Sequence, residues 1–135
     1  AYASEKNVYA IMGDAELYEG SVWETLIFAA HHKINNLRII VDRNGMGILG
    51  KTEELLKLDP LDEKFRSFGF EVDVIDGHDF EQLRRVFSKE TDVPQVIIAN
   101  TIKGKGVSYM EDIWQYHTII PKDDESIKTG MEELS

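Results

Sequence analysis

Four short polar clusters carry most of the side chains in this sequence that could do chemistry. They are Gly13-Asp14-Ala15-Glu16, Asp42-Arg43-Asn44, Asp76-Gly77-His78-Asp79 and Lys103-Gly104-Lys105-Gly106. Each cluster lies at the end of an apolar segment of strand-like composition, at residues 8–12, 37–42, 70–75 and 95–102. Ligands of parallel α/β sheets bind outside the carboxyl ends of the strands. The four clusters therefore predict one shared site at one edge of a sheet.

Asp14 and Asn44 form the pair with the clearest chemistry. Gly13 lets the backbone turn at a strand-to-helix corner, where free N–H groups favour an anion. An Asp carboxylate, an Asn side-chain oxygen and a loop carbonyl suit Mg²⁺ or Ca²⁺, and Mg²⁺ leaves its other positions to phosphates and water. Taken singly, each residue has a simpler explanation, because Asp14 could cap a helix and Asn44-Gly45 could form a hairpin turn.

Two cationic or titratable features accompany this pair. Residues 103–106 are no P-loop, because the glycines are too close together and no Gly-Lys-Ser/Thr follows, so a flexible cationic turn is the alternative. His117 could donate to a phosphate or transfer a proton near neutral pH, although a surface or partly buried histidine is the default. His78 follows a strand end and is expected to fix its loop.

The elements that must position these residues alternate between strands and helices. A helix is expected over 21–32, and another from Asp59-Pro60, read as an N-cap and a first-turn proline, to Phe68. Asp79 and Gln82 resemble a capping box before a third helix. Such alternation predicts an α/β fold with a parallel sheet covered by helices on both faces, and the acidic alternation of 70–75 predicts a strand near the sheet edge.

Composition limits the class of protein. The chain has 135 residues, a formal net charge of −10 and no cysteine. The charge argues against a nucleic-acid partner or an anionic membrane surface, and the lack of cysteine excludes disulfides and Cys-ligated zinc. The expectation is a cytoplasmic domain over residues 1–121, followed by a charged surface extension over 122–135.

Read in order, the motifs are similar to the thiamine diphosphate motif of the transketolase family. They are Gly13-Asp14-Ala15-Glu16, Glu19-Gly20-Ser21-Val22-Trp23-Glu24, Asn35-Asn36-Leu37 and Asp42-Arg43-Asn44-Gly45, followed by 76–79, 101–106 and His117. The resemblance implies the thiamine diphosphate-binding fold and the pyrophosphate-binding domain of a transketolase, of the type found in short separate N-terminal subunits. It implies thiamine diphosphate and Mg²⁺ as cofactors.

Carried over residue by residue, the resemblance implies a role for ten positions. The metal would be held by the side chains of Asp14 and Asn44 and the carbonyl oxygen of Met46. The cofactor would be bound by the backbone of Gly13 and Ala15, by Ile48 near the thiazolium, and by Lys103 and His117, with His117 also helping proton transfer. Glu19 and Glu24 match acids at the subunit interface. Ser21 to Glu24 is also a capping-box pattern, so Glu24 could instead serve a helix end.

Three departures from the family bear on these roles. Ala15 replaces the usual second glycine and excludes positive φ at low cost, and Thr118 stands where glycine is usual. The family normally has a substantial portion before the motif, so Ala1 to Lys6 is expected to be the end of a helix and loop. The pyrimidine-binding domain is also absent, so partner chains, in a homo- or hetero-oligomer, would have to supply both parts.

The implied activity is transfer of a two-carbon ketol unit from a ketose phosphate to an aldose, with the cofactor performing the carbon–carbon chemistry. Two alternatives stay open. One is a response-regulator-like signalling domain with Asp42 as the phosphorylated residue, which is weakened because only Asp14 directly follows the first strand. The other is a non-catalytic regulatory or relic subunit of the same fold.

Overall fold

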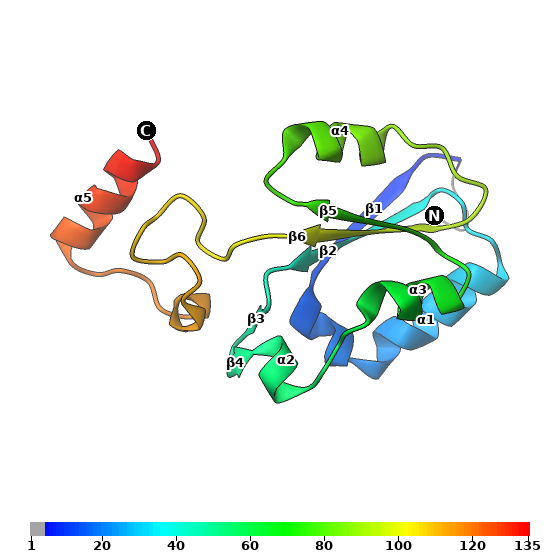
Figure 1. Ribbon diagram of the computed structural model, residues 1–135, viewed down its shortest axis with the longest axis horizontal. Coiled ribbons are helices and arrows are strands. Elements are labelled where there is room, and N and C mark those ends of the chain that lie inside the picture. Colours follow the sequence, from blue (N-terminus) through cyan, green and yellow to red (C-terminus); the bar gives the residue numbers. More distant parts are fainter. Residues whose placement is uncertain (1–4) are drawn as a thin grey trace.

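The computed structural model describes residues 5–135, and its centre is a four-stranded parallel sheet. The strand order is β1-β2-β6-β5, so β1 and β5 lie at the two edges (Figure 1). The strands are β1 (Val8–Gly13), β2 (Leu37–Arg43), β5 (Glu71–Asp76) and β6 (Gln95–Asn100). All four expected strands are confirmed, and the predicted edge position of β5 is correct.

Helices cover both faces of the sheet, as predicted. The larger core lies between the sheet and the helices α1 (Gly20–His31) and α3 (Leu61–Ser67), and Phe65 and Leu26 are buried at its centre. The smaller core lies under α4 (Phe80–Phe87), where Val86 contacts the opposite face. In Figure 1 α4 lies above the strands, and α1 and α3 lie below them. Alternate residues of β6 enter the two cores, because successive strand side chains point to opposite faces.

The outer edge strand β1 is only half covered. Val8, Ala10 and Met12 are partly buried, whereas Tyr9 is 48% and Ile11 74% exposed. On that face the Tyr9 ring meets only the edge of Phe87 among the aromatic rings of the described residues, with centroids 6.0 Å apart. The described part of the chain therefore leaves an apolar surface beside β1.

Two helix starts differ from the sequence expectation. The helix α3 begins after Pro60, which takes the N-cap position, while the Asp59 carboxylate turns to Arg43 at 3.3 Å. Asp59 is therefore an ion-pair partner, and its prediction as the N-cap was wrong. The helix α1 begins at Gly20 with Glu19 as its N-cap, so Ser21 lies inside the helix. The capping-box alternative for Glu24 is therefore also wrong.

The N-cap of α4 was predicted correctly. Asp79 accepts hydrogen bonds from the backbone N–H groups of Glu81 and Gln82 at 2.8 and 3.1 Å. The Gln82 amide donates to the Asp79 carboxylate at 2.8 Å instead of accepting from the Asp79 backbone. The cap is therefore present, but the reciprocal half of the capping box is replaced by a contact between the two side chains.

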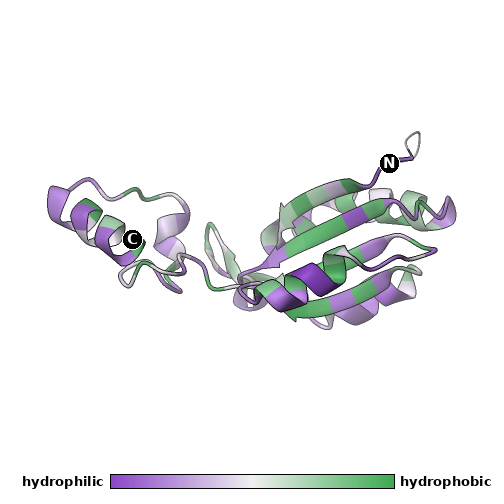
Figure 2. Cartoon of the chain, turned by 90° about the horizontal axis from the view of Figure 1, so that it is seen from above, coloured by the Kyte–Doolittle hydropathy of each residue, from purple (hydrophilic) through white to green (hydrophobic). Residues whose placement is uncertain are grey.

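Beyond β6 the chain leaves the sheet and forms a smaller lobe (Figures 1 and 2). This lobe holds the short 3-10 helix η2 (Trp114–His117) and the helix α5 (Asp124–Glu133). Tyr109 donates to the carbonyl of Ser126 at 2.8 Å, and Ser108 donates to the Glu133 carboxylate, so α5 is held against residues 107–109. No helix was predicted here from the sequence. The boundary at residue 121 stays a prediction.

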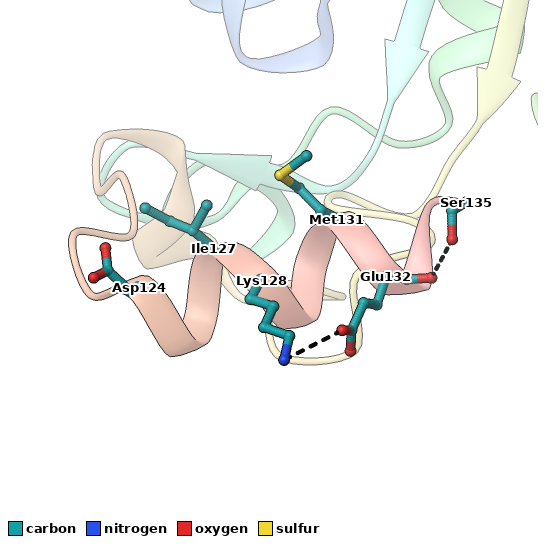
Figure 3. Close-up of a pocket in the computed structure, with 6 residues that line it drawn as sticks. All are labelled: Asp124, Ile127, Lys128, Met131, Glu132 and Ser135. Atoms are coloured by element: carbon teal, nitrogen blue, oxygen red, sulfur yellow. Dashed lines mark hydrogen bonds and ion pairs between the residues drawn. The ribbon is translucent and has the colours of Figure 1, made fainter.

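Residues of α5 and the C-terminal Ser135 line a hollow, and its lining side chains are drawn in Figure 3. Ile127 and Met131 project from one side of the helix, and Lys128 and Glu132 pair on another at 3.7 Å.

The expectation for residues 1–6 falls largely on residues 1–4, which lie outside the described part of the chain. Within residues 5–135, no helix has the length and apolar character needed to cross a bilayer.

Candidate functional site

The parallel register brings the first two polar clusters together. Gly13 at the end of β1 pairs with Asp42 of β2, so Asp14 and the loop from Asn44 leave the sheet side by side. The backbone N–H of Gly45 donates to Oδ2 of Asp14 at 2.8 Å. The sequence prediction that these loops share one edge of the sheet is therefore confirmed.

Asp14 is a buried carboxylate with only one of its oxygens in use. The residue is 1% exposed and begins the short 3-10 helix η1 (Asp14–Tyr18). Its Oδ2 accepts from Gly45, from Arg43 at 3.0 Å and from Thr52 at 3.5 Å. Its Oδ1 has no hydrogen-bond partner among residues 5–135. Burying an unpartnered carboxylate oxygen is costly, so this atom is suited to a ligand outside the protein.

Arg43 holds the occupied side of Asp14. Its side chain is 10% exposed and also reaches Glu53 at 2.5 Å and Asp59 at 3.3 Å. Burial opposes the charged form of Arg43, but its bonds to Glu53 and Asp14 outweigh this and raise the pKa of the guanidinium. Burial likewise opposes ionisation of Glu53, and the bonds from Arg43 and from the Leu58 N–H hold the pKa of that carboxyl below its usual range.

The Asn44 side chain is held in one orientation by one hydrogen bond that it donates and one that it accepts. Its Nδ2 donates to Oδ2 of Asp42 at 3.0 Å, and its Oδ1 accepts from the Met46 N–H at 2.9 Å. Gly45 between them has a φ of +73°, a conformation that favours glycine. A short antiparallel hairpin follows, formed by β3 (Met46–Gly47) and β4 (Gly50–Lys51). The turn of this hairpin is Ile48-Leu49, and Asn44-Gly45 precedes its first strand. The alternative in which Asn44-Gly45 forms a hairpin turn is therefore wrong, and the metal-ligand role of Asn44 stays a prediction.

The hairpin carries one predicted metal ligand, Met46, and one predicted cofactor contact, Ile48. Met46 is buried, and Ile48 at the hairpin tip is 58% exposed. The 3-10 helix η2, which ends in His117, contacts both β3 and β4. The structure therefore places the exposed His117 in an element that packs against the predicted metal loop.

The loop with Lys103 is anchored at both ends. His78 accepts from the Ile102 N–H through Nε2 at 2.9 Å, so its expected role in fixing a loop is confirmed. Gly104 has a φ of +74°, and a Cβ there would lie 2.7 Å from the carbonyl oxygen of Met110. The partly buried Lys103 ammonium forms no ion pair with any other described residue. It is therefore available to an anion.

The backbone of Gly13 and Ala15 has an ordinary conformation. Neither residue has a positive φ, and Ala15 lies inside η1, so replacing glycine by alanine costs no backbone strain. The N–H of Gly13 donates to the Glu16 carboxylate at 2.7 Å, a contact that was not recognised in the sequence. Glu19 and Glu24 are both exposed near the start of α1.

These residues fit a divalent cation with few protein ligands. Within the described residues no group of three or more His, Cys, Asp or Glu side chains could hold a metal. One buried carboxylate oxygen, an amide oxygen with a second lone pair and a loop carbonyl form a sparser donor set. Mg²⁺ bound beside a diphosphate uses such a set, because phosphate oxygens and water complete its shell.

Sequence reasoning missed the residues that support this site from behind. Arg43 was quoted in its cluster without a role, and Thr52, which is 0% exposed and accepts from Arg43 at 3.0 Å, was not singled out. Thr101 donates to Asp42 and links the loop after β6 to the end of β2. An arginine inside an acidic cluster is a signal that could have pointed to the first of these networks.

Comparison with known proteins agrees with this geometry. The model of the family described as transketolase, thiamine diphosphate binding domain, matches residues 2–133. The chain belongs to this family. Its sheet and loops superpose on the transketolase of Campylobacter jejuni with a TM-score of 0.88 and 30% identity, covering 98% of this chain and 21% of that one. The expected fold class is confirmed.

Two relatives are individual subunits of split transketolases. One subunit of the apulose-4-phosphate transketolase of Actinobacillus succinogenes is 40% identical over 133 residues, which cover 97% of this chain and 48% of the relative. The 6-deoxy-6-sulfo-D-fructose transketolase subunit SqwG of a Clostridium species is 38% identical, with 94% and 47% covered. The chain spans about half the length of these relatives. Membership of the family replaces the signalling-domain alternative.

Proposed function

We propose that this chain forms the diphosphate-binding part of a thiamine diphosphate- and Mg²⁺-dependent transketolase. The observation that carries the proposal is the buried Oδ1 of Asp14, which has no hydrogen-bond partner in the described part of the chain and lies beside the loop at Asn44. Family membership supports thiamine diphosphate as the cofactor. When bound, thiamine diphosphate supplies the nucleophilic carbon and the electron sink needed to cleave a carbon–carbon bond beside a carbonyl.

The residues of this chain bind and orient the cofactor. Asp14, Asn44 and the Met46 carbonyl would hold Mg²⁺, and the Lys103 ammonium would place a further positive charge beside the diphosphate. The buried position of Asp14 excludes water from one side of the metal. Gly13, Ala15 and Ile48 provide backbone and apolar contacts to the cofactor.

His117 is the residue of this chain that contacts the reacting centre. Its imidazole would donate a hydrogen bond to the diphosphate or to a substrate oxygen. It would also exchange a proton with the substrate hydroxyl. The contact of η2 with the β3–β4 hairpin supports this role, because it joins the histidine to the metal loop. Ala15 in an unstrained conformation counts against the relic alternative.

The proposed reaction moves a two-carbon ketol unit from a ketose donor to an aldose acceptor. The two subunit relatives are named for apulose-4-phosphate and 6-deoxy-6-sulfo-D-fructose, so an uncommon sugar phosphate or a sulfosugar is the substrate class proposed here. A partner chain supplies the pyrimidine-binding domain, and Glu19 and Glu24 face it. The chain acts in an oligomer.

Calorimetry of the protein together with its partner chains tests the proposal. Thiamine diphosphate should bind only when Mg²⁺ is present, and Asp14→Ala should abolish this binding. Asp92→Ala removes an exposed acid after α4 and should leave binding unchanged. Binding that needs no divalent cation, or that survives Asp14→Ala, would show that this site does not hold the cofactor.

A further inference from the structure

We infer that Asp42 is a positioning residue that sets which atom of the Asn44 amide faces the metal. The inference rests on the proposed function for the metal itself. Asp42 is partly buried, and both of its carboxylate oxygens are in use. Oδ1 accepts from the Thr101 hydroxyl, and Oδ2 accepts from Nδ2 of Asn44. The carboxylate therefore lies between two loops that the proposed site requires.

An Asn side chain can present either its oxygen or its NH₂ group, and only the oxygen can bind a cation. With Nδ2 held by Asp42, the Asn44 oxygen turns to the opposite side, where it already accepts from the Met46 N–H. The reverse orientation would place NH₂ against that N–H and oxygen against the carboxylate. Asp42 and Met46 together exclude it.

Asp42 is itself fixed from the other side. The Thr101 backbone N–H donates to the carbonyl of Arg43 at 3.2 Å, which holds the start of the Lys103 loop against β2. The Thr101 side chain then reaches Asp42. Partners that orient a metal ligand in this way are worth about 10–100-fold in metal affinity. The same contacts tie the metal loop to the loop that carries Lys103.

Two substitutions separate orientation from charge. Asp42→Leu and Asp42→Asn both remove the negative charge, but only the asparagine keeps an oxygen that can accept from Asn44, since its own NH₂ can donate to Thr101. Metal affinity is measured with Mn²⁺ and saturating thiamine diphosphate, by water-proton relaxation, on the protein with its partner chains. Thermal unfolding of each variant is followed in parallel.

The expected result is that Asp42→Leu weakens Mn²⁺ binding by about 10–100-fold while Asp42→Asn stays close to the unsubstituted protein. Equal losses in both variants would show that charge alone matters, and no loss in either would show that Asp42 orients nothing. Both results would overturn the inference.

A second readout does not depend on the cofactor. In ¹⁵N-labelled chain the side-chain NH₂ of Asn44 should be protected from exchange, also in Asp42→Asn, and should lose this protection in Asp42→Leu. If the unsubstituted protein binds no Mn²⁺, the proposed function fails, and the Asn44 signal still decides the inference. Protection that persists in Asp42→Leu would overturn it.

Discussion

Arg43 donates from Nη1 to Oδ2 of Asp14 at 3.0 Å, while the other carboxylate oxygen, Oδ1, has no hydrogen-bond partner among residues 5–135. The guanidinium stabilises the buried negative charge without covering the atom proposed to bind Mg²⁺. The Arg43 guanidinium and the proposed Mg²⁺ would thus each contact a different oxygen of the same carboxylate. This relationship makes the site dependent on a residue that contacts neither the proposed metal nor the proposed cofactor.

Arg43→Met should destabilise the chain by about 2–4 kcal/mol, because it leaves the Asp14 carboxylate buried without its cation. Mg²⁺ should restore part of this loss and should raise the unfolding temperature of the variant more than that of the unsubstituted protein, since binding to the folded state adds stability. Thermal unfolding with and without Mg²⁺ measures both effects.

Arg84→Met is the matched control for this experiment. Arg84 pairs with Glu81 on the surface of α4, and both side chains are largely exposed, so its loss should cost under about 1 kcal/mol and should not respond to Mg²⁺. An Arg43 variant that unfolds like this control would contradict the role given to the buried pair.

Ala15→Gly restores the residue that the family usually has, yet it should not improve cofactor binding. Ala15 lies in η1 with an ordinary φ, so glycine brings no conformation that the site uses. It should instead lower stability by about 0.5–1 kcal/mol through the greater backbone entropy of the unfolded chain. Denaturant unfolding and calorimetry with thiamine diphosphate measure the two quantities. A clear gain in affinity would mean that the alanine obstructs the diphosphate.

Gly104→Ala should destabilise the loop that carries Lys103. The φ of +74° disfavours any other residue, and the new Cβ would lie 2.7 Å from the Met110 carbonyl oxygen, so a cost of about 1–3 kcal/mol is expected. Gly20→Ala is the control, because apart from its own stretch of helix no atom of the described residues lies within 4 Å of a Cβ at that position. It should be neutral or stabilising by up to about 1 kcal/mol. Equal effects of the two changes on unfolding would contradict the close approach at Gly104.

The ion pairs of Lys89 should contribute to the free energy of unfolding only over a defined range of pH. Its bonds to Glu71 and Asp73 raise the pKa of the ammonium. Burial alone would raise the pKa of Asp73, but its bonds from Lys89 and Gln95 hold that pKa below the usual range. The difference in unfolding free energy between the unsubstituted protein and Lys89→Met should therefore be constant between these two titrations.

The signs follow from the two shifts. The Asp73 contribution is present above its unfolded pKa of about 3.9 and is lost as pH falls through the lower folded value. The Lys89 contribution is present below about 10.4 and is lost as pH rises through the higher folded value. Unfolding measured from pH 2 to about 11 checks both ends. Lys57→Met, at an exposed lysine with no ion pair among the described residues, should show neither loss.

Much of the fold followed from the sequence because apolar strands and capped helices are encoded locally. The four strands, both helix layers and the Asp79 cap were predicted from residue patterns. The start of α3 was not predicted, because Asp59 forms an ion pair with Arg43, which is distant in the sequence. Helix α5 was missed because its own apolar pattern is weak and its support comes from Tyr109 and Ser108.

The site divides in the same way. The convergence of Asp14 and Asn44 could be predicted from the rule for parallel strand ends, which the register confirms. The bond between Arg43 and Thr52 and the bond between Asn44 and Asp42 could not, because hydrogen bonds between side chains depend on tertiary packing. The metal, cofactor and interface roles of the individual residues stay predictions.

The open flank of β1 has a practical consequence. An edge strand leaves one row of backbone hydrogen-bond donors and acceptors unpaired. In β1 the exposed side chains of Tyr9 and Ile11 add apolar surface beside this row. Purified alone at high concentration, this chain should self-associate through the β1 edge, and Ile11→Lys should keep it monomeric.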